Sequence, residues 1–198
     1  YTHNTTQWLI GFPYHLLRTD AAGATLSESW FLYDGSTVYT ASPVKGLLTQ
    51  EKHRTSSGVD PVIASSYDTY GNRLSTTDPL GRITTTEYDS SAQSFPIKVT
   101  NALGHTLQTT YDPGTGAIFS TTDPNGQVTR NTYDSFGRLT AVVGPLDTDS
   151  SPSVRYQYDL SSFPTRVTKQ IKAADPGTYY TTHSFADGLG RTIQVRSP

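Results

Sequence analysis

A tyrosine–aspartate pair recurs along this chain at a nearly constant interval, and this recurrence constrains the fold more than any other feature. The pairs begin at Tyr67, Tyr88, Tyr111, Tyr133 and Tyr158, so successive pairs are 21, 23, 22 and 25 residues apart. A fixed period of this length is typical of repeat proteins, in which each unit is one supersecondary element stacked on its neighbours. The chain is therefore predicted to be an array of similar units.

A second signal, with Asp or Asn first and Gly fourth, predicts where the chain turns. Asp suits the first position of a type I turn because its carboxylate accepts backbone N–H groups, Pro presets φ at the second, and Gly can adopt a left-handed conformation at the fourth. Such a turn also closes a β-hairpin with a bulge. The predicted structural turn residues are Asp68, Gly71, Asp78, Pro79, Gly81, Asn101, Gly104, Asp123, Pro124, Gly126, Asp134 and Gly137.

The segments between the turns have the composition of β-strands. Residues 82–88, 105–111 and 127–133 are rich in β-branched and aromatic residues, and none has apolar residues at helical spacing. The predicted fold is all-β, an antiparallel meander of repeated β-hairpins with about 22 residues per two-strand repeat. Threonine occupies much of both faces, which favours a thin sheet with water on both sides over a sheet packed on a thick core.

The regularity of this pattern divides the chain into four stretches. Residues 1–66 are predicted to be an irregular β region leading into the array, 67–143 the regular array, 144–152 a loop insertion at one rim, and 153–198 further degenerate repeat strands. Within the first stretch, residues 43–48 and 49–55 are expected to pair as strands, with a loop at 56–58. A short helical pattern at 169–174 is followed at once by a turn signal.

Composition argues against several classes of partner. A net charge of −2 gives no reason to expect nucleic acid. No apolar run approaches the roughly 20 residues of a membrane-spanning helix. With no cysteine, neither a disulfide framework nor a thiolate metal site is possible. The bias towards Thr, Ser, Gly and Tyr favours a secreted or cell-surface bacterial protein, and the absence of methionine favours a fragment of a larger chain.

No catalytic, cofactor-binding or metal-binding residue is predicted. The five histidines are scattered singly, without the paired spacing of metal ligands. The turn aspartates are expected to bind backbone amides and not to act as acid–base pairs or calcium ligands. The repeated tyrosines are expected to pack across strands, and the alternative is a sugar-binding stripe.

Three motifs resemble the YD-repeat, or Rhs-repeat, family. They are Tyr67-Asp68-x-x-Gly71-Asn72-Arg73-Leu74, Tyr133-Asp134-x-x-Gly137-Arg138-Leu139 and Asp78-Pro79-x-Gly81-Arg82. Residues 8–11 and 185–191 also look like segments of the B component of insecticidal Tc toxin complexes and of related SpvB-type proteins. The Asp-Pro-x-Gly sequences resemble the start of the self-cleavage signature of Rhs proteins, but Arg82 and Gln127 stand where that signature has Leu.

The resemblance implies a curved or spiralling sheet that forms a hollow shell around a toxin polypeptide. The toxin would be a further domain of a larger Rhs chain or a partner subunit. The chain is then expected to be a structural, non-enzymatic segment of that shell. The alternative is an adhesion module that binds carbohydrate or a cell-surface partner.

Overall fold

The computed structural model describes residues 1–55, 58–175 and 177–197, and all regular secondary structure in these ranges is β-strand. The chain divides into two compact units, residues 1–106 and 107–198. Each unit is described by itself below. Of the loop expected at 56–58, residues 56 and 57 lie outside the described residues.

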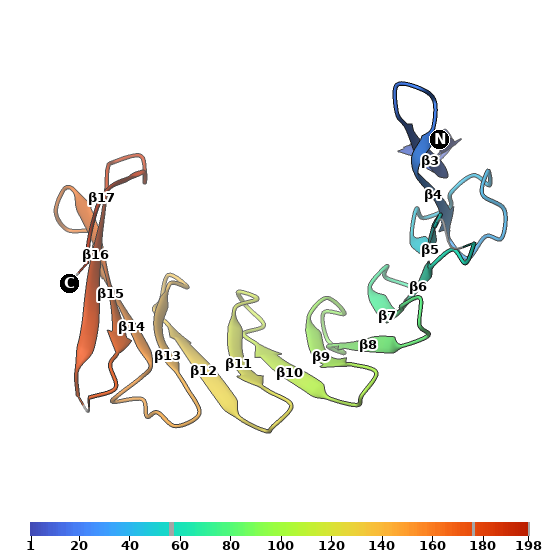
Figure 1. Cartoon of the computed structure of the whole chain (residues 1–198). Coiled ribbons are helices and arrows are strands. Elements are labelled where there is room, and N and C mark those ends of the chain that lie inside the picture. The colour runs from blue at the N-terminus through green and yellow to red at the C-terminus, as the bar shows by residue number, and fades with distance from the viewer. Residues whose placement is uncertain (56–57, 176, 198) are drawn as a thin grey trace. The chain divides into compact units, whose positions relative to one another are not determined.

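The first unit contains a short two-stranded sheet and a longer antiparallel meander. In the meander each strand pairs with the one that precedes it in the chain (Figure 1). The short sheet is formed by β1 (Thr2–Asn4) and β2 (Leu9–Phe12). The meander is formed by β3 (His15–Thr19), β4 (Thr25–Tyr33), β5 (Leu48–His53), β6 (Val62–Tyr67), β7 (Arg73–Thr77), β8 (Ile83–Tyr88) and β9 (Pro96–Thr100).

The second unit continues the same strand order. Its strands are β10 (Thr106–Tyr111), which begins at the last residue of the first unit, β11 (Ile118–Thr122), β12 (Val128–Tyr133), β13 (Leu139–Val143), β14 (Val154–Asp159), β15 (Thr165–Lys172), β16 (Tyr179–Ala186) and β17 (Thr192–Arg196). All of the pairings within it are antiparallel. The prediction of an all-β antiparallel meander of hairpins is therefore confirmed.

The strands end at two opposite borders of the sheet, and these borders differ. Within each unit we call them the two rims. At the Tyr rim the strands end in a repeat tyrosine such as Tyr67 or Tyr133, and at the Thr rim they end in a threonine such as Thr77 or Thr122. At the Tyr rim the pairing carries a β-bulge: Tyr67 lies opposite Arg73 while Ser66 lies opposite Ser75. The same shift recurs at Tyr88, Tyr111 and Tyr133, whereas β7–β8 and β11–β12 pair without a shift. Because a bulge increases local twist and re-aims side chains, the two rims present different surfaces.

Little of the sheet is covered. The chain exposes 12938 Å², whereas a compact folded monomer of 21.6 kDa exposes about 9,200 Å². Among the described residues, the buried hydrophobic side chains are Leu32 and Val143, and Pro43 and Pro152 are also buried. The thin, two-sided sheet expected from the threonine pattern is what the structure has.

The strand expected at residues 43–48 is wrong, because β5 begins only at Leu48. Asp34, which has a positive φ of 55°, holds residues 44–47 as a loop. Its carboxylate accepts the N–H groups of Val44, Lys45, Gly46 and Leu47 at 2.6–3.0 Å. These N–H groups are therefore not available for strand pairing.

The helical pattern at residues 169–174 also does not lead to a helix. Residues 169–172 are the last part of β15, where Lys169 lies opposite Thr182 and Ile171 opposite Tyr180. Pairing on both sides, with β14 and β16, overrides the weak local preference.

The left-handed turn glycines give a first testable expectation. Gly126 has φ of +77°, and a Cβ built there would meet nothing within 4 Å. The cost of Gly126→Val is therefore backbone strain alone, and we expect a loss of about 1–3 kcal/mol of unfolding free energy. Urea denaturation measures it, with Gly126→Asn as the control because asparagine tolerates this conformation. Equal stability of the valine variant and the unmodified chain would contradict the turn geometry.

Candidate functional site

The candidate site is the pair of rims, because the repeated side chains gather there. Seven turns in the described part of the chain share one hydrogen-bond pattern. In the turn that begins at Asp78, the Gly81 N–H donates to the Asp78 carbonyl, and the Asp78 N–H donates to the Arg82 carbonyl. The Asp78 carboxylate also accepts the N–H groups of Leu80 and Arg82 at 2.9 and 3.0 Å. The seven turns span residues 20–24, 68–72, 78–82, 101–105, 123–127, 134–138 and 187–191.

The structure places all the sequence-predicted turn residues within this pattern. Asp68, Asp78, Asn101, Asp123 and Asp134 are the first residues of their turns. Pro79 and Pro124 occupy the second positions. Gly71, Gly81, Gly104, Gly126 and Gly137 have positive φ at the fourth.

A side chain that the sequence reasoning missed completes several of these turns at the fifth position. Arg82, Arg138 and Arg191 each donate Nε–H to the second oxygen of the aspartate four residues earlier, at 2.6–2.7 Å. The backbone N–H of Arg82 and its guanidinium lower the pKa of Asp78. The recurring Gly-Arg pair in the motif was the available signal for this ion pair.

The repeat tyrosines tie each hairpin to the strand before it. The hydroxyl of Tyr67 donates to the carbonyl of Leu48 at 2.8 Å, and the hydroxyl of Tyr158 to the carbonyl of Leu139 at 2.9 Å. Leu48 and Leu139 are the first residues of β5 and β13, the strands that precede those of the two tyrosines. Tyr88 and Tyr133 bind the first residues of β7 and β11 in the same way, at 3.4 and 2.8 Å. Tyr111 ends β10 at an equivalent bulge.

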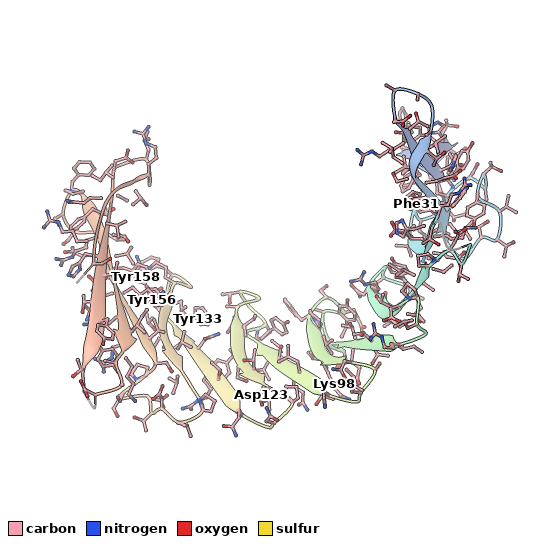
Figure 2. All side chains as sticks on the ribbon, in the orientation of Figure 1. Phe31, Lys98, Asp123, Tyr133, Tyr156 and Tyr158 are labelled. Atoms are coloured by element: carbon pink, nitrogen blue, oxygen red, sulfur yellow. The ribbon has the colours of Figure 1, made fainter. Side chains whose placement is uncertain are left out.

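In the second unit, the ring of one repeat tyrosine also links its strand to a neighbouring turn on the Tyr rim. The guanidinium of Arg138 lies 4.5 Å from the ring centre of Tyr158. Since Arg138 also binds Asp134, the ring connects β14 to the turn between β12 and β13. Burial raises the pKa of Tyr158. Figure 2 labels Tyr133 and Tyr158 at this part of the second unit.

Longer Tyr-rim loops are also organised by an aspartate. Asp89 accepts the N–H groups of Ser91, Ala92, Ser94 and Phe95, using both carboxylate oxygens, at 2.5–3.1 Å. These donors, with those of Phe95 and Ala92 the strongest, lower the pKa of Asp89 far below its usual range. The loop is therefore folded around one ionised side chain.

The connection between β13 and β14, which contains the predicted rim insertion, is held by a partly buried ion pair. Asp147 accepts a hydrogen bond from the ammonium group of Lys172 at 2.5 Å and another from the hydroxyl of Ser153. These two donors lower the pKa of Asp147. Lys172 ends β15, so the connection is fixed to the strand beyond β14.

One arrangement in the first unit has the connectivity of a catalytic triad. The hydroxyl of Ser29 lies 2.9 Å from His53 Nδ1, and His53 Nε2 lies 3.1 Å from a carboxylate oxygen of Glu51. The three residues share one face of β4 and β5. Backbone N–H groups within paired strands donate to the neighbouring strands, so those of β4 and β5 are not available as oxyanion donors. The arrangement is a cross-strand hydrogen-bond chain.

No cluster of three or more His, Asp or Glu side chains arranged to hold a metal ion is found among the described residues. No helix in the same residues is long and apolar enough to cross a membrane. The remaining histidines have hydrogen-bond partners: His3 with Gly11, His15 with Glu28, His105 with Asn101, and His183 with Thr168.

Fold and rims together define a repeat protein built from antiparallel hairpins with aspartate-capped turns. Residues 114–149 match the family model described as RHS Repeat. The resemblance of the repeat motifs to the YD-repeat, or Rhs-repeat, family is thereby confirmed. A search of the curated proteins found no match.

Solved structures with a similar arrangement include two titled Crystal Structure of TcdB2-TccC3 and Crystal Structure of TcdB2-TccC3-Cdc42. The first is 15% identical with a TM-score of 0.39, and the second 16% identical with a TM-score of 0.38. A third is titled Crystal Structure of TcdB2-TccC3 without hypervariable C-terminal region and is 18% identical with a TM-score of 0.38. Each alignment covers 93% of this chain and 11% of the solved chain, so this chain spans about a tenth of their length.

Proposed function

We propose that this chain is a wall segment of a hollow β-shell that encloses a toxin polypeptide, and that it acts without enzymatic activity. The observation that carries the proposal is a repeat sheet held together at its rims while its faces stay uncovered. The RHS repeat at residues 114–149 supports the same assignment. The wall would be part of a larger, secreted or cell-surface chain.

Stabilisation at the rims is what a thin wall needs. A sheet with two open faces buries few apolar side chains, so its order must come from turns, backbone pairing and contacts between neighbouring hairpins. Asp78, Asp134 and Asp187 with their arginines cap the turns, and Tyr67 and Tyr158 bind hairpin to hairpin. Neither face is then committed to a core of the chain's own, and one can face an enclosed polypeptide.

The tyrosines support the alternative function, an adhesion module, less well than they support a wall segment. Tyr67, Tyr88, Tyr133 and Tyr158 are half-buried, and their hydroxyls bind backbone carbonyls. A sugar-binding stripe would instead present free ring faces and hydroxyls to solvent. The same geometry explains these tyrosines as packing between strands.

The proposal is tested on the natural full-length chain that contains this segment. We expect limited proteolysis to leave an internal polypeptide intact, and solution scattering to show a particle of low internal density. Tyr158→Ala, which weakens the wall, should make the protected polypeptide cleavable, while Tyr70→Ala, at an exposed turn, should not. Cleavage of all segments at equal rates in the unmodified chain would refute enclosure. Specific binding on a glycan array that is lost in Tyr88→Ala would favour adhesion.

A further inference from the structure

Two repeats of this chain, one in each unit, have the same hydrogen-bond frame around a repeat tyrosine. In the second unit, the Asp134 N–H donates to the Arg138 carbonyl and the Arg138 N–H donates to Asp134 Oδ1, at 2.9 and 3.0 Å. In the first unit, Asp34 and Leu47 exchange the same two hydrogen bonds, at 2.8 and 2.9 Å. The next residue begins a strand in both repeats, and its carbonyl accepts the hydroxyl of a tyrosine 19 residues later. Leu47 therefore stands where the other repeat has Arg138.

The two repeats differ in what lies beside the tyrosine ring. In the second unit, the guanidinium of Arg138 binds Asp134 at 2.7 Å and lies 4.5 Å from the ring centre of Tyr158. In the first unit, a recess of about 410 Å³ lies beside Tyr67, and this volume is typical of ligand pockets. Because its lining includes the counterparts of the residues that surround the guanidinium, the recess is the open counterpart of a filled cation site. We call it the Tyr67 recess, and it is lined by Asp34, Val44, Lys45, Leu47, Thr49, Tyr67 and Asp68.

The charged groups of the Tyr67 recess suit a cation. The carboxylates of Asp34 and Asp68 face one ammonium group, that of Lys45, so the lining has an excess of negative charge. Lys45 is exposed, and its ammonium group donates to the Thr69 carbonyl at 3.2 Å. Oδ2 of Asp68 accepts the side-chain amide of Asn72 at 2.9 Å, and a carboxylate oxygen can accept a second hydrogen bond. The recess therefore offers an acceptor next to an aromatic ring.

We propose that the Tyr67 recess binds an external guanidinium group, carried by an arginine side chain of a polypeptide or by a small guanidine. The guanidinium lies against the ring of Tyr67 and donates to the carboxylate of Asp68. Arg138 makes the same two kinds of contact in the second unit. A guanidinium is favoured over an ammonium because it is planar, stacks on aromatic rings and donates in a fixed fork. The proposal does not depend on enclosure of a toxin, since it concerns one recess in one repeat.

Amide NMR spectra of the 198-residue chain test this site. The probes are agmatine, a small guanidine, and the peptide acetyl-Gly-Arg-Gly-amide. The matched control peptide carries citrulline, which has nearly the same shape as arginine and no charge. We expect saturable shifts of the amides around the recess, such as those of Leu47 and Asp68, with a Kd on the order of 1 mM for a guanidinium and about tenfold weaker binding of the citrulline peptide. Tighter binding of the peptide than of agmatine assigns the site to a polypeptide, and the reverse order assigns it to a small guanidine.

Substitutions within the recess separate a filled site from a damaged one. Leu47→Arg supplies a guanidinium from the chain itself, so the probes should no longer cause shifts, while the melting temperature should stay equal or rise. Leu47→Met is of similar size and uncharged, and it should bind the probes as the unmodified chain does. Asp68→Asn keeps the turn, as the native turn at Asn101 shows, and should weaken binding by about fivefold.

The reciprocal change is made in the second unit. Arg138→Leu should open a matching recess, and agmatine should then shift the amides of Leu139 and Tyr158, which it leaves unchanged in the unmodified chain. Equal shifts from the arginine and citrulline peptides would overturn the proposal. Shifts that persist in Leu47→Arg, or no saturable shift of the unmodified chain with either guanidinium probe, would overturn it as well.

Discussion

Tyr158→Ala is expected to lower the free energy of unfolding by about 2–3 kcal/mol. The substitution removes a half-buried ring, the hydrogen bond to the Leu139 carbonyl and the contact with the Arg138 guanidinium. Deletion of an aromatic ring from a full core costs about 3–5 kcal/mol, and partial exposure reduces that value here. Because Arg138 also holds Asp134, the change loosens the neighbouring turn as well.

Two further variants separate the parts of this effect. Tyr158→Phe keeps the ring and removes only the hydroxyl, so it should cost about 1 kcal/mol. Tyr70→Ala removes a tyrosine that is 70% exposed at a turn tip and should change stability by less than about 0.5 kcal/mol. Urea denaturation of all three variants measures the order of their losses in unfolding free energy. A loss in Tyr158→Ala no larger than in Tyr70→Ala would show that the repeat tyrosines do not connect the hairpins.

The turns and strands could be predicted because their determinants are local. A turn such as 123–127 needs Asp123 to accept two N–H groups, Pro124 to fix φ, and Gly126 to adopt a positive φ. All three requirements are written within five consecutive residues. The same holds for strands such as β8 and β12, whose residues allow no helical face.

The contacts between hairpins could not be predicted because they depend on register. The bond from Tyr158 to Leu139 joins residues 19 apart, and its partner is set by the pairing of β13 with β14. The bulges at the Tyr rim add a residue on one strand only, such as Leu74 opposite the Ser66–Tyr67 step. A periodic sequence pattern does not show which strand carries the extra residue.

The misplaced strand at residues 43–48 has a related cause. These residues have acceptable strand composition, and what prevents the strand is Asp34, nine or more residues before them. Phe12 adds to this arrangement, because two carbons of its ring lie only 2.7 Å from where a Cβ of Gly46 would be. Phe12, Asp34 and Gly46 come together only in the folded loop, so no local sequence signal could predict that loop.

Acidification below about pH 4 is expected to destabilise the chain steeply. Eleven of its seventeen carboxyl side chains have lowered pKa values. Each of them binds protons less readily in the folded than in the unfolded chain. Stability from such groups is fully present above the unfolded pKa, about 3.9 for Asp, and is lost as pH falls through the lower folded values. These groups should therefore leave the melting temperature nearly constant from pH 7 to pH 5. The melting temperature should then fall as the pH drops below about 4.

Two substitutions test whether the carboxylates themselves carry this dependence. Asp89 uses both oxygens as acceptors, so Asp89→Asn turns an NH₂ group towards backbone donors and should lower the melting temperature at pH 7. Asp123 uses one oxygen, as the native Asn101 does, so Asp123→Asn should have little effect. The difference between the two variants should narrow as the pH falls below about 4, because the carboxyl group of Asp89 then binds a proton in the unfolded chain more readily than in the folded one. Equal melting temperatures for both variants at pH 7, or a melting temperature of the unmodified chain that does not change between pH 5 and 2, would contradict the assignment of the rims to ionised aspartates.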